Sequence, residues 1–210
     1  MTDPAAANAT LIAFLEEHEE EIAEAQRQFE ASELEELKRE ASEQLAKYSD
    51  AQLGEKLLEL CYTQRLIDMP EIHNILIHRP NVSTYQADGG ICALHVACRG
   101  DDETMMDDIV ELLINHGADV NAATYYLESN EAEQQPVFWT PLMEASYFGN
   151  TGIVQMLLNA RANIHAKTKN GTTALEVAID QDQEGSHDEC VKLLRACGAV
   201  DWREAGAGAA

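Results

Sequence analysis

The stretch TPLMEASYFGNTGIVQMLLNARANIHA, Thr140–Ala166, holds the features that decide the fold. Thr140 suits a helix N-cap, because its hydroxyl can accept a hydrogen bond from a backbone N–H group of the first turn. Pro141 suits the first helical position, which needs no N–H donor. A second apolar run, IVQMLL, begins after the short turn FGN. The stretch therefore predicts two short helices joined by a turn.

The same pattern occurs twice more in the chain. The segments CALHVACRGD and TALEVAIDQD align with TPLMEASYFGN, and each precedes a second apolar helix with a short tail. Leu142 and Leu175 are 33 residues apart, whereas Leu94 and Leu142 are 48 apart. Four of the extra residues lie between the helices of the earlier copy, and eleven lie between the two copies. Such a period is typical of stacked repeat proteins, in which no unit can bury its apolar face alone.

The 33-residue period, Thr140-Pro141-Leu142, Ala93-Leu94-His95 and the run GADVNA at Gly117–Ala122 resemble the ankyrin repeat. The resemblance covers Asp88 to about Asp201, and a weaker unit without the T-P-L-H signature precedes it. It implies an all-α solenoid of about four helix–turn–helix units, usually with β-hairpin fingers between them. We place the units at about residues 51–87, 88–123, 137–168 and 169–201, with an insertion at 124–136.

The ends of the second helices should have a left-handed residue. Gly117 and Gly198 suit that conformation because glycine has no Cβ. Arg161 stands at the equivalent place in the third unit. That helix end is therefore expected to be strained or built differently.

Residues 1–50 are predicted to form an acidic helical extension. Residues 1–60 hold 16 acidic and 5 basic side chains. Ser32-x-x-Glu35 and Ser49-x-x-Gln52 match capping boxes, which predicts two or three consecutive helices. Their apolar stripes either pack on the rest of the protein or form a dimerising coiled coil, and a break in the pattern near Ser32 disfavours the coiled coil. Residues 202–210 are expected to be disordered.

The bulk composition limits the classes of function. The chain has 210 residues, 38 of them acidic and 14 basic, and a formal net charge of −24. This excess favours basic partners and disfavours direct binding to nucleic acid or anionic membranes, which are also negative. No apolar run reaches the roughly 18 residues of a transmembrane helix, and no signal peptide is expected. Five cysteines without regular spacing favour reduced thiols and a location in the cytoplasm or nucleus.

Two segments imitate metal sites. Cys92, His95 and Cys98 recur every three residues, as metal ligands on a helix can. They align with cap, brace and packing positions of the other units, so we expect structural roles for all three. Residues 180–191 imitate the opening of a calcium loop, but Val191 stands where a bidentate glutamate is required. Cys190 and Cys197 are expected in the core, and no metal, cofactor or catalytic residue is predicted.

The resemblance implies binding through the loops and the concave face of the first helices. Aromatic side chains at non-core positions are typical of binding anchors. We predict a partner-binding surface made of Trp139, Tyr147, Phe148, Tyr125, Tyr126, Arg99, Asp101, Asp102, Asp180 and Gln181. In the alternative, the insertion folds over the aromatic residues and covers them. The pattern around Asn121 also resembles ankyrin sequences modified by asparaginyl hydroxylases, which makes Asn121 a hypothetical hydroxylation site.

The sequence thus predicts a non-enzymatic module that binds a basic protein. One alternative is a dedicated chaperone or inhibitor of a basic nucleic-acid-binding protein. Another is a structural subunit of a larger assembly, docked through the N-terminal helices. Self-association through these helices is possible but not favoured, and an enzyme is the alternative from a different class.

Overall fold

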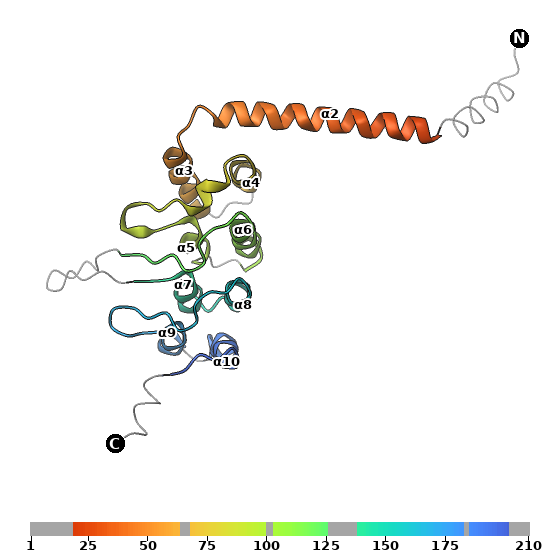
Figure 1. The fold of residues 1–210 in the computed structure, drawn as a ribbon. Helices are drawn as coiled ribbons and strands as arrows, with labels where there is room; N and C mark the ends of the chain where they lie inside the picture. The colour runs from red at the N-terminus through yellow and green to blue at the C-terminus, as the bar shows by residue number, and fades with distance from the viewer. Residues whose placement is uncertain (1–18, 64–67, 100–102, 126–137, 183–184, 202–210) are drawn as a thin grey trace, which may run out of the picture. The chain divides into compact units, whose positions relative to one another are not determined.

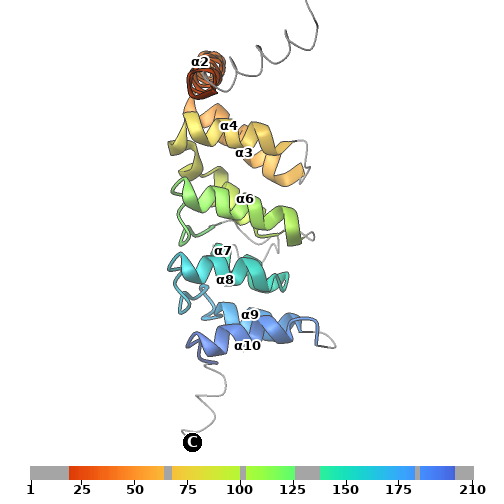
Figure 2. The same cartoon turned by 90° about the vertical axis from the view of Figure 1, so that its right-hand side faces the viewer.

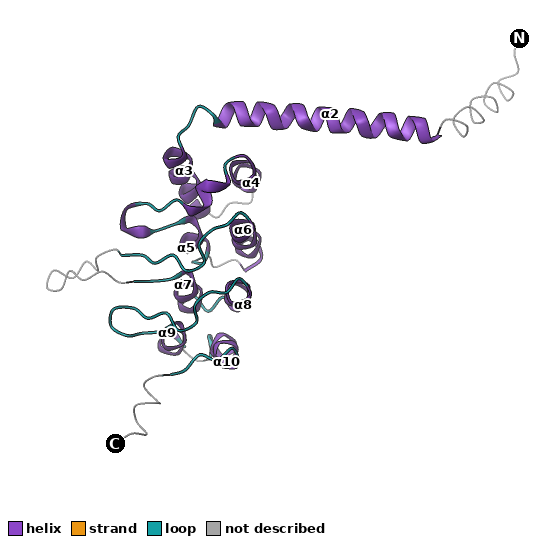
Figure 3. Cartoon of the chain, viewed as in Figure 1, coloured by secondary structure: helices purple, strands orange, loops and turns teal. Residues whose placement is uncertain are grey.

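The structure is a computed structural model that describes residues 19–63, 68–99, 103–125, 138–182 and 185–201. These residues form α-helices and short 3₁₀ helices, with no strand among them (Figure 3). The elements are α2 (Glu19–Leu45), α3 (Asp50–Thr63), α4 (Met69–His78), η2 (Pro80–Thr84), η3 (Asp88–Gly90), α5 (Ala93–Ala97), α6 (Glu103–Asn115), α7 (Pro141–Tyr147), α8 (Thr151–Asn159), α9 (Ala174–Gln181) and α10 (Asp188–Ala196). The all-α prediction is confirmed, whereas the described loops between units form turns and not β-hairpins.

The chain divides into an N-terminal part, Met1–Lys47, and a C-terminal part, Tyr48–Ala210, each compact by itself. In the C-terminal part, helices α3, α5, α7 and α9 stack in one column, and α4, α6, α8 and α10 stack in another (Figure 1). The helices of the second column lie side by side and nearly parallel (Figure 2). The described parts of the loops between successive pairs project from the side of the first column (Figure 1). This is the arrangement that four stacked helix–turn–helix units should give.

Helix α2 belongs to the N-terminal part and corrects one prediction. It continues through Ser32 without a break, so the predicted capping box at Ser32 and Glu35 does not begin a new helix. Ser32 is exposed within a run of Glu, Leu, Ala and Lys, and these strong helix formers outweigh one serine. Two residues on this helix, Leu34 and Leu37, are 52% and 62% exposed.

The second predicted box is confirmed at the start of α3. Ser49 Oγ accepts a hydrogen bond from the backbone N–H of Gln52 at 3.2 Å, while Gln52 Oε1 accepts one from the backbone N–H of Ser49 at 3.0 Å. Both groups would otherwise lack an intrahelical partner. This reciprocal pair begins the first helix of the stack.

The core of the stack consists of the same positions in successive units. Leu94, Leu142 and Leu175 face inward from the first helices, and each is at most 1% exposed. The second helices contribute equivalent buried rows, namely Ile109, Ile153 and Cys190, and Leu113, Leu157 and Leu194. Each apolar face is covered only when the neighbouring unit is present. Stability therefore comes from the interfaces between units as much as from single helices.

The ends of the second helices follow the glycine pattern with one exception. Gly117 and Gly198 have φ values of 85° and 95°. Arg161 takes the same left-handed conformation with φ 68°, and no other non-glycine residue of the described chain has a positive φ. A Cβ atom in this region is sterically unfavourable, so of the two alternatives expected for this helix end, the strained one is observed.

We predict that Arg161→Gly stabilises the protein by about 1 kcal/mol, because glycine tolerates positive φ without the Cβ clash. The measurement is urea unfolding followed by circular dichroism. Gly117→Ala is the matched control and should destabilise by a similar amount. A less stable Arg161→Gly variant would show that contacts of the arginine side chain outweigh the backbone strain.

Candidate functional site

The Cys92, His95 and Cys98 group lies inside the stack and has structural roles. Cys92 is the N-cap of α5, and its backbone N–H donates to His95 Nδ1 at 3.3 Å. Since Nδ1 accepts this bond, the ring proton is on Nε2, which donates to the carbonyl oxygen of Trp139 at 3.2 Å. His95 thus connects the second unit to Trp139 of the third unit, which immediately precedes the helix cap Thr140. The cap role predicted for Cys92 and the brace role predicted for His95 are confirmed by these contacts. The packing role predicted for Cys98 is confirmed by its full burial.

The protonation states of these side chains disfavour metal binding. Burial raises the pKa of the Cys92 thiol and raises that of Cys98 far above its usual value. Burial also lowers the pKa of His95 to about 4, so the imidazole is neutral near pH 7. Metal-binding sulfur must lose its proton, which this apolar site opposes. Among the described residues, no group of three or more His, Cys, Asp or Glu side chains is arranged to hold a metal ion.

An aromatic cluster, defined as Trp139, Tyr147 and Phe148, lies on the third unit. The ring centroids of Trp139 and Tyr147 are 5.9 Å apart, and those of Tyr147 and Phe148 are 5.2 Å apart, both in edge-to-face geometry. Tyr147 and Phe148 are 41% and 38% exposed, while Trp139 is half-buried. The three rings form one partly exposed surface, as expected for side chains outside the core.

The base of the insertion holds Trp139 in place. The backbone N–H of Thr124 donates to the carbonyl oxygen of Trp139 at 2.8 Å, and the backbone N–H of Trp139 donates to Thr124 Oγ1 at 3.3 Å. These bonds join the two ends of the insertion. Thr140 then caps α7 by accepting from the backbone N–H of Met143 at 3.3 Å, as predicted. The tryptophan backbone is therefore fixed on both sides.

The loop before α10 supports the other end of the cluster. His187 Nε2 donates to the carbonyl oxygen of Tyr147 at 2.9 Å, and the backbone N–H of His187 donates to Asp182 Oδ1 at 2.8 Å. The imidazole also lies against Gly149, where an added Cβ would come within 3.0 Å of the ring. The polar segment between α9 and α10 thus packs on the turn that carries Tyr147 and Phe148.

An ion pair lies one helical turn from Tyr147. Arg99 Nη2 is 2.6 Å from Glu144 Oε1, and the Glu144 side chain is 6% exposed. A buried carboxylate requires a charged partner, so Arg99 neutralises a residue of the third unit. Its guanidinium was predicted to contact the binding partner, but much of its charge is directed at Glu144. A contact of Arg99 with a partner stays a prediction, and its guanidinium would share that contact with Glu144.

The remaining predicted binding residues are not all brought together. The ring of Tyr125 lies over Gly90, and the backbone N–H of Tyr125 donates to the carbonyl oxygen of Gly89 at 2.6 Å. Asp180 is exposed and Gln181 half-buried at the end of α9, where they occupy the register positions of Tyr147 and Phe148. Tyr126, Asp101 and Asp102 lie outside the described residues, as does most of the insertion at 124–136 and the tail at 202–210. The roles of all these residues in binding stay predictions.

Three residues near the cluster were missed by sequence reasoning. Phe138 is 42% exposed and immediately precedes Trp139, so the pair Phe-Trp could have indicated it. Glu144 and His187 carry no such local signal, because their partners lie in other units. The prediction that Cys197 lies in the core was wrong. Cys197 is exposed, because it follows the last residue of α10.

Asn121 participates in a connection between loops of successive units. Its side-chain Oδ1 accepts a hydrogen bond from the backbone N–H of Asn163 at 2.7 Å, and its own backbone N–H donates to Asp119 Oδ1 at 2.9 Å. The residue is exposed. Its modification remains a hypothesis.

Comparisons with known proteins agree with this architecture. A family model described as Ankyrin repeats (3 copies) matches residues 61–168 and 121–203. The chain is 31% identical over 137 residues to the putative ankyrin repeat protein YahD of Escherichia coli (strain K12), a match that covers 63% of the chain and 59% of YahD. It is 33% identical over 132 residues to the E3 ubiquitin-protein ligase XBAT33 of Arabidopsis thaliana, covering 61% of the chain and 22% of that ligase.

A third relative shares a shorter segment. Ankyrin repeat and SAM domain-containing protein 6 of Rattus norvegicus is 38% identical over 80 residues, which cover 36% of the chain and 8% of that protein. The matches span less than two thirds of each of these relatives. No helix of the described residues is long and apolar enough to cross a membrane.

We predict that His95→Gln reduces the dependence of stability on acid. The folded pKa of about 4 lies below the ordinary 6.5, so the unfolded chain binds the proton first and stability falls as the pH is lowered from about 6.5 towards 4. The loss attributable to His95 should approach about 3 kcal/mol. Glutamine at this position can still complete the capping box but cannot titrate.

The measurement is urea unfolding of both proteins between pH 7 and pH 4.5. Carboxylates titrate in both proteins, so the difference between the two curves isolates His95. Parallel curves would contradict the neutral, buried state of the imidazole.

Hydroxylation of Asn121 predicts a species that is heavier by one oxygen atom. The measurement is the intact mass of protein purified from its native cell, with Asn121→Ala as the control. Absence of the heavier species would count against the hypothesis.

Proposed function

Because the chain belongs to the ankyrin-repeat family, whose repeats are protein–protein interaction modules, we propose that it binds a basic protein partner through the aromatic cluster and the neighbouring loops. The aromatic cluster is the observation that carries this proposal. Exposed Tyr147 and Phe148 together with half-buried Trp139 provide apolar area on a surface that the core does not require. Such rings are enriched among residues that dominate binding energy. We propose no catalytic role and no cofactor.

The charge of the protein supports the choice of a basic partner. Its formal net charge is −24, so a basic protein is attracted over a long range and an acidic one is repelled. At close range, lysine and arginine side chains interact favourably with aromatic ring faces.

Hydrogen bonds to the backbone of Trp139 and Tyr147, here called the hydrogen-bonded frame, keep the aromatic cluster in a fixed geometry. Trp139 is held by Thr124 and His95, and the carbonyl oxygen of Tyr147 is held by His187. All of these bonds to the cluster involve backbone atoms of Trp139 and Tyr147. Replacing either ring therefore leaves the frame intact, while a fixed surface loses less conformational entropy on binding.

The alternatives differ in the part that electrostatics plays. A chaperone or inhibitor of a basic nucleic-acid-binding protein would rely on exposed charge, and its complex should weaken with salt. A structural subunit of a larger assembly would bury more apolar surface, possess a fixed stoichiometry and resist salt. We favour the general interaction module because the aromatic cluster combines apolar contact with an acidic surrounding chain. A cytoplasmic or nuclear location is also proposed, on the basis of four buried and reduced cysteines.

We predict that Trp139→Ala and Tyr147→Ala each weaken capture of the partner by about tenfold or more, because both remove a ring from the centre of the surface. The measurement is affinity purification from the native cell with quantitative mass spectrometry at two salt concentrations. Tyr62→Ala is the matched control, since Tyr62 is 75% exposed on α3, away from the aromatic cluster. Equal capture by the three variants and the original protein would refute the role of the cluster.

A further inference from the structure

A long segment without any carboxylate begins in the third unit and ends in the fourth. The whole chain has 38 Asp and Glu residues among 210, yet none occurs from residue 145 to residue 175. This segment runs from the end of α7 through α8 and the following loop to the start of α9. In a chain of charge −24, a segment of this kind is a marked local exception. Its loop also gathers basic side chains.

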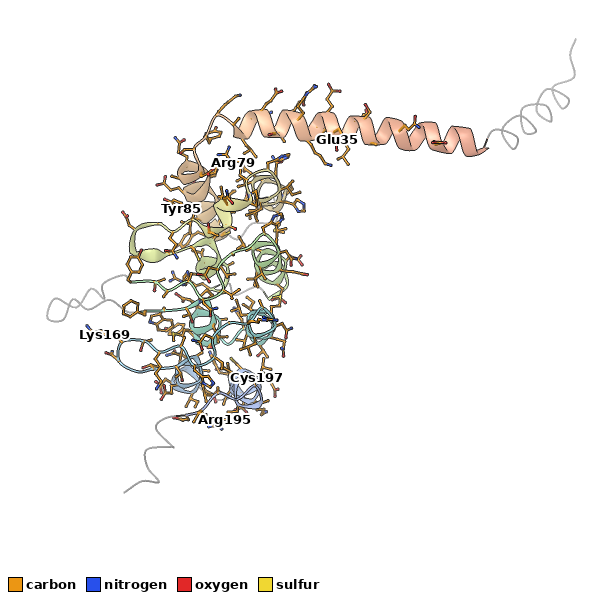
Figure 4. The ribbon with its side chains drawn as sticks, viewed as in Figure 1. Glu35, Arg79, Tyr85, Lys169, Arg195 and Cys197 are labelled. Carbon is orange, nitrogen blue, oxygen red and sulfur yellow. The ribbon has the colours of Figure 1, made fainter. Side chains whose placement is uncertain are left out.

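The side chains of this loop alternate between inward and outward positions. Five residues at every second place are exposed, whereas the residues between them are half-buried or buried. The exposed residues are Arg161, Asn163, His165, Lys167 and Lys169. We call this row the basic loop edge. Lys169 lies at the outer end of the loop between α8 and α9 (Figure 4).

The corresponding row of the second unit has a different chemistry. In the register that aligns Val110 with Val154, its members carry one acid and no lysine or arginine. They are Gly117, Asp119, Asn121, Ala123 and Tyr125. The repeat fold therefore does not demand basic residues at these places.

Asp119 and Asn163 stand at equivalent positions of the two rows and show most directly that the fold does not determine their charge. Asp119 Oδ1 accepts from the backbone N–H two residues later at 2.9 Å, and Asn163 Oδ1 accepts in the same way from His165 at 3.1 Å. The same turn is thus built once with a carboxylate and once with a neutral amide. Since the backbone accepts either, the absence of negative charge from the third loop is not explained by folding.

We propose that the basic loop edge docks an acidic segment of a partner protein. The segment would lie along the loop, with its carboxylates opposite Arg161, Lys167 and Lys169. Charge complementarity supports this occupant, because an acidic segment is repelled by most of this protein and attracted by this edge. Repulsion elsewhere also restricts the segment to one place, which adds specificity.

The basic loop edge shares no residue with the aromatic cluster and prefers the opposite charge. The two surfaces therefore allow the protein to hold a basic and an acidic segment at once. This inference does not depend on the proposed basic partner. The inference also predicts that the acidic segment is recognised at short range. At physiological salt the screening length is about 8 Å, so the repulsion between the segment and more distant acidic side chains of the protein is weakened.

The test uses the full chain and a fluorescein-labelled synthetic peptide of twelve alternating glutamate and alanine residues. Binding is measured by fluorescence anisotropy in 0.15 M salt. We expect saturable binding that Lys169→Glu weakens by about three- to tenfold, a range typical of one or two surface charge contacts. Asn163→Asp should weaken it in the same direction while preserving the turn.

Lys56→Glu is the matched control. It makes the same change in net charge on α3 of the first unit, and it should leave peptide binding within about twofold, as expected for a distant screened charge. Trp139→Ala should also retain peptide binding, which separates this proposal from the function proposed for the aromatic cluster. Thermal unfolding of each variant verifies that the fold is kept.

Four results would overturn the proposal. The first is no saturable binding by the original protein, and the second is an equal effect of Lys169→Glu and Lys56→Glu. The third is equal or tighter binding of a labelled DNA oligonucleotide, which would indicate a general polyanion surface. The fourth is a dimer in sedimentation velocity that Lys169→Glu abolishes, which would make the occupant an acidic segment of a second copy.

Discussion

The fold depends on apolar helix faces that no single unit can bury. Leu94, Leu142 and Leu175 occupy the same place in successive first helices, and each is almost fully buried against neighbouring units. The free energy of folding is therefore shared across the interfaces between units. The helices are short, with α5 only five residues long, and such helices are unstable in isolation. Stacking keeps them folded and leaves the loops available for other roles.

Polar contacts between units add specificity to this apolar stack. Met143 and Glu176 stand at the positions of the next two units that correspond to His95. His95 and Glu176 both complete capping boxes, and Met143 is simply buried. His95 also donates to Trp139, so one variable position links a helix start to the aromatic cluster. The proposed binding surface thus rests on a residue that was first predicted to be only structural.

The sequence predicted the repeat fold well because its signals are local and repeated. The cap at Thr140, the glycine endings and the strained Arg161 all follow from residues within a few positions. It failed at Ser32, where a local capping pattern lay inside a strong helix-forming sequence. It also failed at Cys197, where the helix ends one residue earlier than the apolar spacing suggested. In both cases, the helix boundary depended on competition that a motif does not show.

The features of the candidate surfaces also fall into two classes, those that residue order determines and those that depend on the tertiary structure. The sequence by itself determined the repeat, the register of the rows and the absence of carboxylates from residues 145–175, because these are properties of residue order. Only the tertiary structure decided that Arg99 pairs with Glu144, that His187 supports Tyr147, and that three aromatic rings meet at edge-to-face distances. These contacts join residues that are up to 45 positions apart. Their geometry depends on how neighbouring units stack, and no local pattern encodes it.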